Sequence, residues 1–283
     1  MKALSAFVVL ALSSSPCLAA TVSASSTEWA AFLGNYDFLA DQQTGQPESD
    51  IVGNGSNPGF FMTFNNNGAA STTDGTIGFR LRLDAAGGNT NNPAFTRVAW
   101  IGVDANVDGA IDAFLGIANQ GSSSTLGIFA PGNGANTSPS TTSIASSPAF
   151  SYTIGSGNYN YRPVNFTTDG GTTNDVTPSS SGDPDYYLSV LLPFGDLVSY
   201  LATKGITIND QSGMRFVVAT STQANSLNQD LGGVNGGTNS STTWVALGGF
   251  SQVVKPGGSP IPEPSSLLLA SSALLLGLSR RKR

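Results

Sequence analysis

Oxygen-bearing side chains are concentrated in the segment Asp104–Asp112, with the sequence DANVDGAID. Gly109 permits a sharp turn in its middle. Around that turn, five oxygen donors can converge on one cation: the side chains of Asp104, Asn106, Asp108 and Asp112 and the Ala110 carbonyl. A dication would relieve the repulsion among the carboxylates. Calcium suits such a loop because it accepts about six to eight flexible oxygen ligands, whereas magnesium requires stricter octahedral geometry. We therefore predict a structural calcium ion here.

The segments that flank this loop, Val98–Val103 and Ala113–Ile117, are typical of β-strands, so a hairpin is expected. The loop resembles the first part of an EF-hand, but Leu115 stands where an EF-hand has its bidentate Glu, which excludes an EF-hand proper. It is also similar to the hairpin calcium loops of FG-GAP propeller repeats. A single copy cannot build a propeller, so only the loop chemistry carries over. The alternative is an Asx-rich turn that binds no metal.

Composition excludes many enzymes. The chain has no histidine, and its single cysteine, Cys17, lies in a segment expected to be removed. Triads that need His or Cys, and the usual zinc sites, are therefore excluded. Two carboxylate pairs, Asp183 with Asp185 and Asp169 with Asp175, are available for glycoside hydrolysis, but we expect each to be a solvated turn acid or an accessory calcium ligand. We predict that the protein is not an enzyme.

The body of the chain is acidic. Of the 12 basic residues, Lys2 and four at the C-terminus lie in terminal segments, which leaves 7, and of the 18 acidic residues only Glu263 does, which leaves 17. The body therefore carries a net charge of about −10. This argues against nucleic acid and against anionic membranes as partners, and favours cations or neutral glycans.

The N-terminus has the three parts of a secretory signal peptide. Lys2 is followed by the apolar stretch Ala6–Leu12 and by small residues that end at Ala20. We expect residues 1–20 to be removed, with cleavage after Ala19 or Ala20.

The C-terminus also has three parts. A Pro-Glu-Pro motif at Pro262, Glu263 and Pro264 precedes an apolar run of 14 residues, 265–278, and a basic tail, 279–283. As a helix the run would span about 21 Å of a hydrocarbon core of roughly 30 Å, which makes a marginal anchor. Basic residues resist translocation, so the end of the chain is expected to stay in the cytoplasm through four side chains: Arg280, Arg281, Lys282 and Arg283.

Residues 262–283 resemble the PEP-CTERM sorting signal of Gram-negative bacteria, which exosortase-type membrane enzymes recognise. The resemblance implies export, transient anchoring in the inner membrane and processing near the motif. It also implies a final location at the cell surface or in the extracellular matrix, often in species that make extracellular polysaccharide.

The remaining segment, 21–255, is long enough for one domain, followed by a linker at 256–261. Abundant Gly, Asn, Ser and Thr and a clean alternation in Thr76–Asp84 favour an all-β domain. In that strand we expect Ile77, Phe79, Leu81 and Leu83 inside and Gly78, Arg80 and Arg82 in solvent. Further strands are expected at Arg97–Val103, Ile111–Ala118, Thr125–Phe129, Phe150–Ile154, Tyr159–Thr167, Tyr186–Leu192, Arg215–Thr220 and Thr243–Leu247. Helices are expected at Thr27–Leu39 and Phe194–Thr203, and a turn-rich, mobile loop at Asn225–Ser241.

A second resemblance is looser. The strand, proline and aromatic residue of Asp185–Phe194 resemble part of family-9-like carbohydrate-binding sandwiches. With the hairpin before it and Met214–Thr220 after it, the resemblance implies a jelly-roll-like single β-sandwich, but no binding residue can be transferred from it. Aromatic faces stack on sugar rings, and five aromatic residues are candidates for this: Trp29, Trp100, Trp244, Tyr159 and Tyr161. The alternative is that they lie in the core. The sequence thus predicts an exported, calcium-stabilised structural or adhesive protein, with a non-catalytic carbohydrate-binding module acting on extracellular polysaccharide as the alternative.

Overall fold

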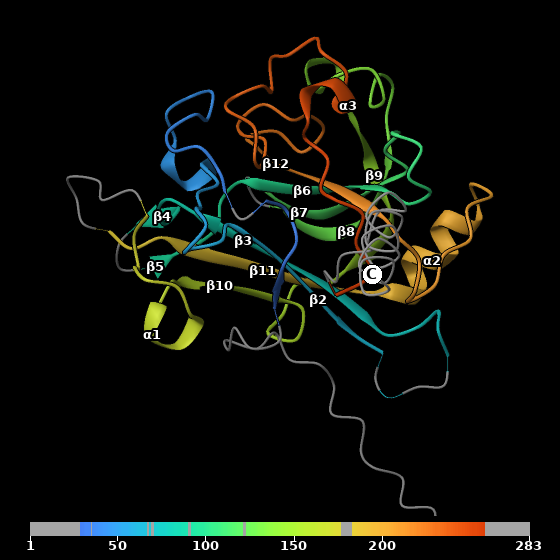
Figure 1. Ribbon diagram of the computed structural model, residues 1–283, viewed down its shortest axis with the longest axis horizontal. Helices are drawn as coiled ribbons and strands as arrows, with labels where there is room; N and C mark the ends of the chain where they lie inside the picture. The colour runs from blue at the N-terminus through green and yellow to red at the C-terminus, as the bar shows by residue number, and fades with distance from the viewer. Residues whose placement is uncertain are drawn as a thin grey trace, which may run out of the picture.

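Two antiparallel sheets of five strands each dominate the computed structural model and face each other across a hydrophobic core (Figure 1). The model describes residues 29–257, except 35, 67, 69–70, 90–91, 121–122 and 177–182. The predicted signal peptide, most of the linker and the sorting signal at 262–283 lie outside these residues. In the part of the chain that is described, no helix is long and apolar enough to cross a membrane. The prediction of an all-β sandwich is confirmed.

The first sheet has the order β1-β2-β3-β11-β10. Its strands are β1 (Ala30–Ala31), β2 (Phe60–Asn65), β3 (Thr76–Leu83), β11 (Tyr186–Pro193) and β10 (Tyr159–Pro163). Neighbours pair in antiparallel register along their lengths, for example Leu188 with Leu81 on β3.

The second sheet has the order β12-β6-β7-β8-β9. Its strands are β12 (Arg215–Ser221), β6 (Val98–Asp104), β7 (Ala113–Gln120), β8 (Ser123–Pro131) and β9 (Ile144–Tyr152). Strands β6 to β9 follow one another in the chain and in the sheet, because short connections join neighbours. This meander differs from the predicted jelly-roll connectivity, in which the chain forms two Greek keys across two sheets. A separate pair, β4 (Gly88–Asn89) and β5 (Asn92–Pro93), lies beyond the end of β3.

The core between the sheets is built from alternate residues of each strand. On β3 the inward residues are the four that the alternation predicted, and all are at most 3% exposed. They pack with residues of the opposite sheet such as Ile101, Leu115 and Val218. Phe32 lies among Phe60, Phe79 and Phe216 in edge-to-face contacts with centroids 5.7–6.4 Å apart. Burial of this apolar surface is the main stabilising contribution.

The opposite face of β3 is also buried, so the prediction of a half-buried strand was wrong. Arg80 is 1% exposed and Arg82 0%. The Arg80 guanidinium lies 4.3 Å from the Trp29 ring centroid and 5.1 Å from that of Tyr187. Cations stack favourably on aromatic faces, which explains how the charge is accommodated.

Arg82 is neutralised by a carboxylate. Its Nε lies 2.5 Å from Asp185 Oδ2, with both side chains fully buried. Its Nη2 donates to the Thr173 carbonyl at 3.0 Å. The pair fixes the segment before β11 against the outer face of the first sheet.

A third layer covers the outer face of the second sheet. Leu227, Leu231 and Trp244 pack against Trp100 and Phe114. The Trp244 ring nitrogen donates to the Ala135 carbonyl at 2.8 Å. The segment Asn225–Ser241, expected to be a mobile loop, is thus anchored by the buried side chains of Leu227 and Leu231.

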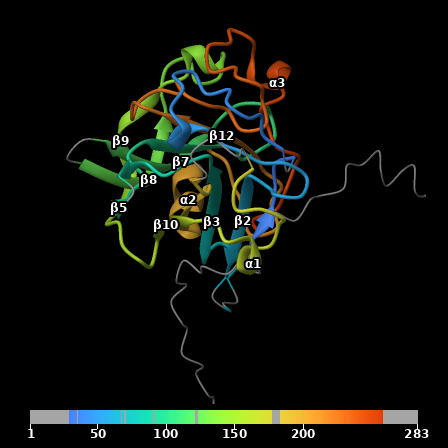
Figure 2. The same ribbon diagram turned by 90° about the vertical axis from the view of Figure 1, so that its left-hand side faces the viewer.

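Helices are short. The predicted helix after Pro193 is confirmed as α2 (Phe194–Ala202), whose ribbon lies at one end of the two sheets and appears between them in the view of Figure 2. Its residues Phe194, Leu197 and Leu201 are buried in the core. A one-turn helix, α1 (Phe166–Asp169), occupies the end of the strand expected at Tyr159–Thr167. Two 3-10 turns lie at Pro47–Ser49 and Pro139–Thr141.

Two predicted elements were wrong, and strands β2, β4 and β5 were missed. The expected strand Thr243–Leu247 is a helical turn, α3 (Trp244–Leu247), because the Thr243 side chain caps its start and Gly248, at φ 81°, ends it. Where the helix Thr27–Leu39 was expected, the described residues include β1 paired with β2, so the sheet takes the backbone hydrogen bonds.

The Arg82–Asp185 pair gives the first prediction. Asp185→Ala leaves a buried guanidinium without its carboxylate, so we expect the free energy of unfolding to fall by about 3–5 kcal/mol. Denaturant unfolding measures the change. Asp183→Ala, two residues away and exposed, is the matched control and should change stability by less than about 0.5 kcal/mol. Equal effects of the two substitutions would contradict this account.

Candidate metal centre

The predicted calcium loop joins β6 to β7, which are antiparallel neighbours, so the expected hairpin is present. The Asp112 backbone N–H donates to the Val103 carbonyl at 2.7 Å and closes the loop. Val107 adopts a positive φ of 62° and Gly109 one of 91°, so the chain turns sharply between the strands. The sequence therefore placed the loop correctly.

Asp104 is the anchor of the loop. Its carboxylate is fully buried and accepts from the backbone N–H groups of Asp108 at 3.1 Å and Gly109 at 3.0 Å. It also receives Nη2 of Arg215 at 2.7 Å and Nε at 3.1 Å. Arg215 stands opposite Asp104 in the β12–β6 register. One of the predicted calcium ligands therefore already has a cationic partner.

The other predicted ligands also make hydrogen bonds within the loop. Asn106 and Asp108 are exposed, and their side chains bond to each other at 2.9 Å. Asp108 Oδ1 accepts from the Ala110 N–H at 2.8 Å, and Asp112 Oδ2 accepts from the Ala105 N–H at 2.8 Å. Burial raises the pKa of Asp112. Among the described residues, Asp104, Asp108 and Asp112 do not form a group whose ligand oxygens all lie within 4.8 Å of one another. Calcium binding by this loop stays a prediction.

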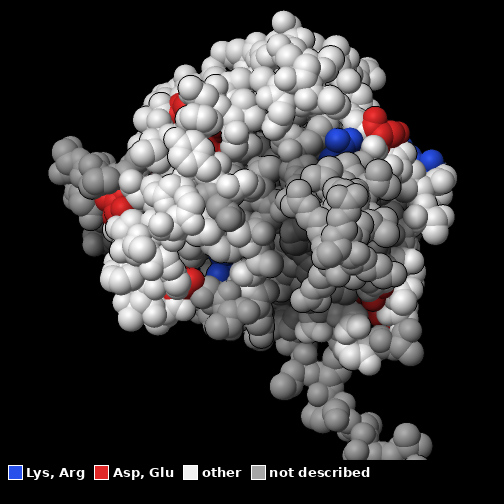
Figure 3. All heavy atoms as spheres, viewed as in Figure 1, with Lys and Arg blue, Asp and Glu red and all other residues white. Residues whose placement is uncertain are grey.

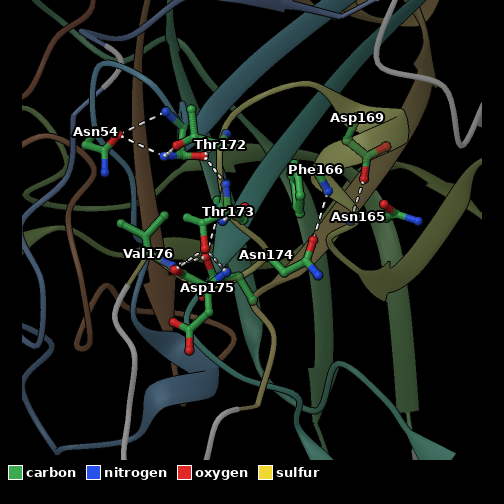
Figure 4. A network of polar contacts seen from close by, with 12 residues as sticks. Asn54, Asn165, Phe166, Asp169, Thr172, Thr173, Asn174, Asp175 and Val176 are labelled. Carbon is green, nitrogen blue, oxygen red and sulfur yellow. Dashed lines mark hydrogen bonds and ion pairs between the residues drawn. The ribbon is translucent and has the colours of Figure 1, made fainter.

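The second candidate set, the carboxylates around α1 and β11, holds the fold together. Asp169 accepts from Arg162 with 2.6 Å between Oδ1 and Nη2, and Asp185 pairs with Arg82. Figure 4 shows the segment from Asn165 to Val176, which includes Asp169, tied by polar contacts such as that of Asn174 Oδ1 with the Phe166 N–H at 2.9 Å. Asp183 is exposed, whereas Asp169 and Asp185 are buried. The expectation of solvated turn acids therefore fails for these two.

The aromatic residues considered as a sugar platform are not gathered on an exposed face. Trp29, Trp100 and Trp244 are 8%, 0% and 2% exposed. Tyr159 and Tyr161 are partly buried and pack against the core. Tyr161 also stacks on Tyr186 with 5.0 Å between centroids. These positions favour the alternative in which the aromatic residues belong to the core.

Sequence reasoning missed two groups of carboxylates that the fold assembles. In the described residues, ligand oxygens of Asp37, Asp41 and Asp230 lie within 4.8 Å of one another, as do those of Asp84, Asp175 and Asp185. The second group includes the partner of Arg82 and is therefore partly neutralised. No local pattern could have found the first group, because Asp230 lies far along the chain from Asp37 and Asp41.

Comparison with known proteins identifies one segment. Residues 260–283 match the model of the PEP-CTERM protein-sorting motif. No curated protein and no solved structure matches the chain. The chain therefore carries a signal that indicates an exported protein directed to an exosortase, as the resemblance of residues 262–283 predicted.

The Asp104–Arg215 pair gives the second prediction. Arg215→Met keeps an apolar side chain but leaves buried Asp104 without its cation, so the free energy of unfolding should fall by about 1.5–3 kcal/mol. Denaturant unfolding in chelator measures this. The matched control is Arg97→Met, because both members of the Arg97–Glu48 pair are partly exposed and its loss should cost less than about 1 kcal/mol. If Arg97→Met lowered the free energy of unfolding as much as Arg215→Met, the Asp104–Arg215 pair would contribute no more than a partly exposed salt bridge, and the prediction would be wrong.

Proposed function

We propose that this chain is an exported protein that an exosortase-type enzyme sorts to the cell surface or the extracellular matrix, where it has a structural or adhesive role without catalysis. The observation that carries the proposal is the PEP-CTERM motif at residues 260–283. It stands at the C-terminal end of a sequence whose described part is a β-sandwich.

The sequence of the signal suggests how sorting proceeds. The basic residues 280–283 hold the end of the chain in the cytoplasm, and the apolar run 265–278 anchors it weakly in the inner membrane. Pro262 and Pro264 keep the motif extended beside Glu263, which suits recognition by a processing enzyme. Release of the anchor would then deliver the sandwich to the cell surface.

The distribution of basic residues on the body argues against nucleic-acid binding. Of its 7 basic residues, Arg80 and Arg82 are buried, and Arg97, Arg162 and Arg215 are each in a salt bridge. On the face shown in Figure 3, charged side chains are few and scattered. A nucleic-acid site would need a continuous basic patch.

Calcium at the loop 104–112 remains part of the proposal. The Asn106 and Asp108 side chains are exposed and available to an ion, while Asp104 would have to share its carboxylate with Arg215. A bound calcium ion would neutralise the loop carboxylates and stiffen the β6–β7 hairpin.

The alternative is a non-catalytic module that binds extracellular polysaccharide. The burial of the three tryptophans removes the main sequence feature that suggested it. Polysaccharide should raise the melting temperature of a glycan-binding module but not that of a structural protein. Thermal unfolding of one sample can therefore distinguish the two functions.

The sorting proposal predicts the behaviour of a motif variant. With Pro262, Glu263 and Pro264 all changed to Ala, the apolar run and the basic tail persist but the recognition motif is lost. We expect the variant to accumulate unprocessed in the inner-membrane fraction of a host that has an exosortase. Immunoblotting of cell fractions measures this.

The control is a matched triple substitution in the preceding linker, Gly257→Ala, Gly258→Ala and Ser259→Ala. It should be processed and released like the unaltered chain. Normal release of the motif variant, or release in a host whose exosortase is deleted, would refute the sorting proposal.

The choice between a structural protein and a glycan-binding module gives a further prediction. Because the described tryptophans are buried, the host's extracellular polysaccharide should leave the melting temperature unchanged to within about 1 °C. Thermal unfolding with and without polysaccharide checks this. A saturable rise in melting temperature would favour the carbohydrate-binding alternative.

A further inference from the structure

Four aspartates from two distant segments of the chain lie close together, and we call them the acidic cluster: Asp37, Asp41, Asp50 and Asp230. The first three belong to the connection between β1 and β2, and the fourth follows β12. Asp37 and Asp230 are 0% exposed and Asp50 is 1% exposed. Three of the four bring ligand oxygens within 4.8 Å of one another. Several buried carboxylates this close together are costly unless a positive charge compensates them.

Each carboxylate is held in place by backbone N–H groups. Asp37 Oδ2 accepts from Gly233, and Asp41 Oδ2 accepts from Gly236. Asp50 Oδ2 accepts from the N–H of Ala40 at 2.9 Å. The two oxygens of Asp230 accept from Ile51 and Leu231, both at 2.7 Å. These bonds fix the orientation of the carboxylates. Asp37, Asp41 and Asp50 each use only Oδ2 in them.

The remaining oxygens have no donor. Oδ1 of Asp37, Asp41 and Asp50 is buried and makes no hydrogen bond. Two neutral oxygens of the same connection, Gln42 Oε1 and Gln46 Oε1, are in the same state. Buried polar atoms are nearly always satisfied. A set made only of acceptors points to a missing cation.

Asp37 supports a ligand here independently of the clustering itself. Its side chain is fully buried and belongs to the group whose oxygens lie within 4.8 Å of one another, yet its Oδ1 has no hydrogen-bond partner. Asp50 stands outside that group but adjoins it, because its Oδ2 accepts from Ala40, the neighbour of Asp41, and the residue after it, Ile51, donates to Asp230. Asp50 is also almost fully buried, with Oδ1 unpartnered.

No side chain of the chain's body supplies the countercharge. Among the described residues, four arginines form salt bridges, and their partners are Glu48, Asp104, Asp169 and Asp185. Arg80 lies over Trp29 and Tyr187, while Lys204 lies over Tyr200 and Lys255 donates to Gln211. All 7 basic residues of the body are thereby placed away from the acidic cluster.

We propose that the acidic cluster binds one calcium ion through the carboxylates of Asp37, Asp41 and Asp230, with Asp50 beside them. The donors are all oxygen, which suits a hard cation, and three carboxylates suit calcium better than magnesium, which keeps several waters and is usually bound by one or two carboxylates. The ion would act as a staple between the connection that leads to β2 in the first sheet and the segment that follows β12 in the second. Thr220 Oγ1, which donates to the Ser49 carbonyl at 2.5 Å, lies at the same junction. This site is distinct from the predicted loop at 104–112.

Calcium titration of the full chain in detergent, after removal of metal by a chelator, tests the proposal. Asp230→Asn keeps the shape of the side chain and removes its charge, so calcium affinity should fall by at least about 10- to 100-fold. Asp37→Asn should do the same. Asp108→Asn is the matched control, because it removes one carboxylate from the β6–β7 loop, and the acidic-cluster site should keep its affinity in this variant. If Asp230→Asn does not fold, Asp41→Asn, at the partly exposed member of the cluster, replaces it.

Thermal unfolding supplies a second readout. Calcium at about 1 mM should raise the melting temperature of the unaltered chain by about 5 °C or more, and that of Asp230→Asn by much less. Asp230→Asn leaves the N–H of Ile51 or of Leu231 facing the amide NH2 and so can melt lower even in chelator; the readout is therefore the rise in melting temperature that calcium causes in each protein, relative to the same protein in chelator. Equal calcium binding by Asp230→Asn and the unaltered chain, or no binding by the unaltered chain, would overturn the proposal. Neither result would affect the sorting proposal, which rests on cell fractionation.

Discussion

The structure depends on how a chain with few cations neutralises the carboxylates that it buries. The body has 7 basic residues against 17 acidic ones. Three arginines are committed to buried or nearly buried aspartates: Arg82 to Asp185, Arg162 to Asp169 and Arg215 to Asp104. Each of these pairs fixes a loop or a strand end against a sheet. Since an uncompensated buried charge costs several kcal/mol, the position of each arginine largely decides which connections are rigid.

The same constraint links the fold to the place where the protein works. The PEP-CTERM motif indicates export, and outside the predicted signal peptide the chain has no cysteine. Cross-links between its segments therefore come from packing, hydrogen bonds and ion pairs. A calcium ion bound by the acidic cluster would add one more cross-link, available only where the free calcium concentration is high, as outside the cell. Folding of the junction between the sheets would then be completed after export.

Predictions from the sequence succeeded where a local pattern within one strand or helix determines the structure of that element. The alternation in Thr76–Asp84 predicted the inward residues of β3 correctly, and Pro193 predicted the start of α2. The same alternation gave the wrong environment for Arg80 and Arg82, because a polar face in the sequence does not reveal that another layer covers it. Trp244 was misplaced for a related reason. The caps at Thr243 and Gly248 outweighed the β-forming residues between them.

The sequence by itself determined the sorting signal and the hairpin loop at 104–112, because each is contiguous and its chemistry follows from order and spacing alone. Only the tertiary structure decided that Asp104 pairs with Arg215, that the tryptophans lie in the core and that Asp37 meets Asp230. These contacts join residues more than about 100 positions apart in the chain. They arise because two sheets and the layers outside them bury both faces of central strands such as β3 and β6, and no periodicity within one segment records which distant segment will cover it.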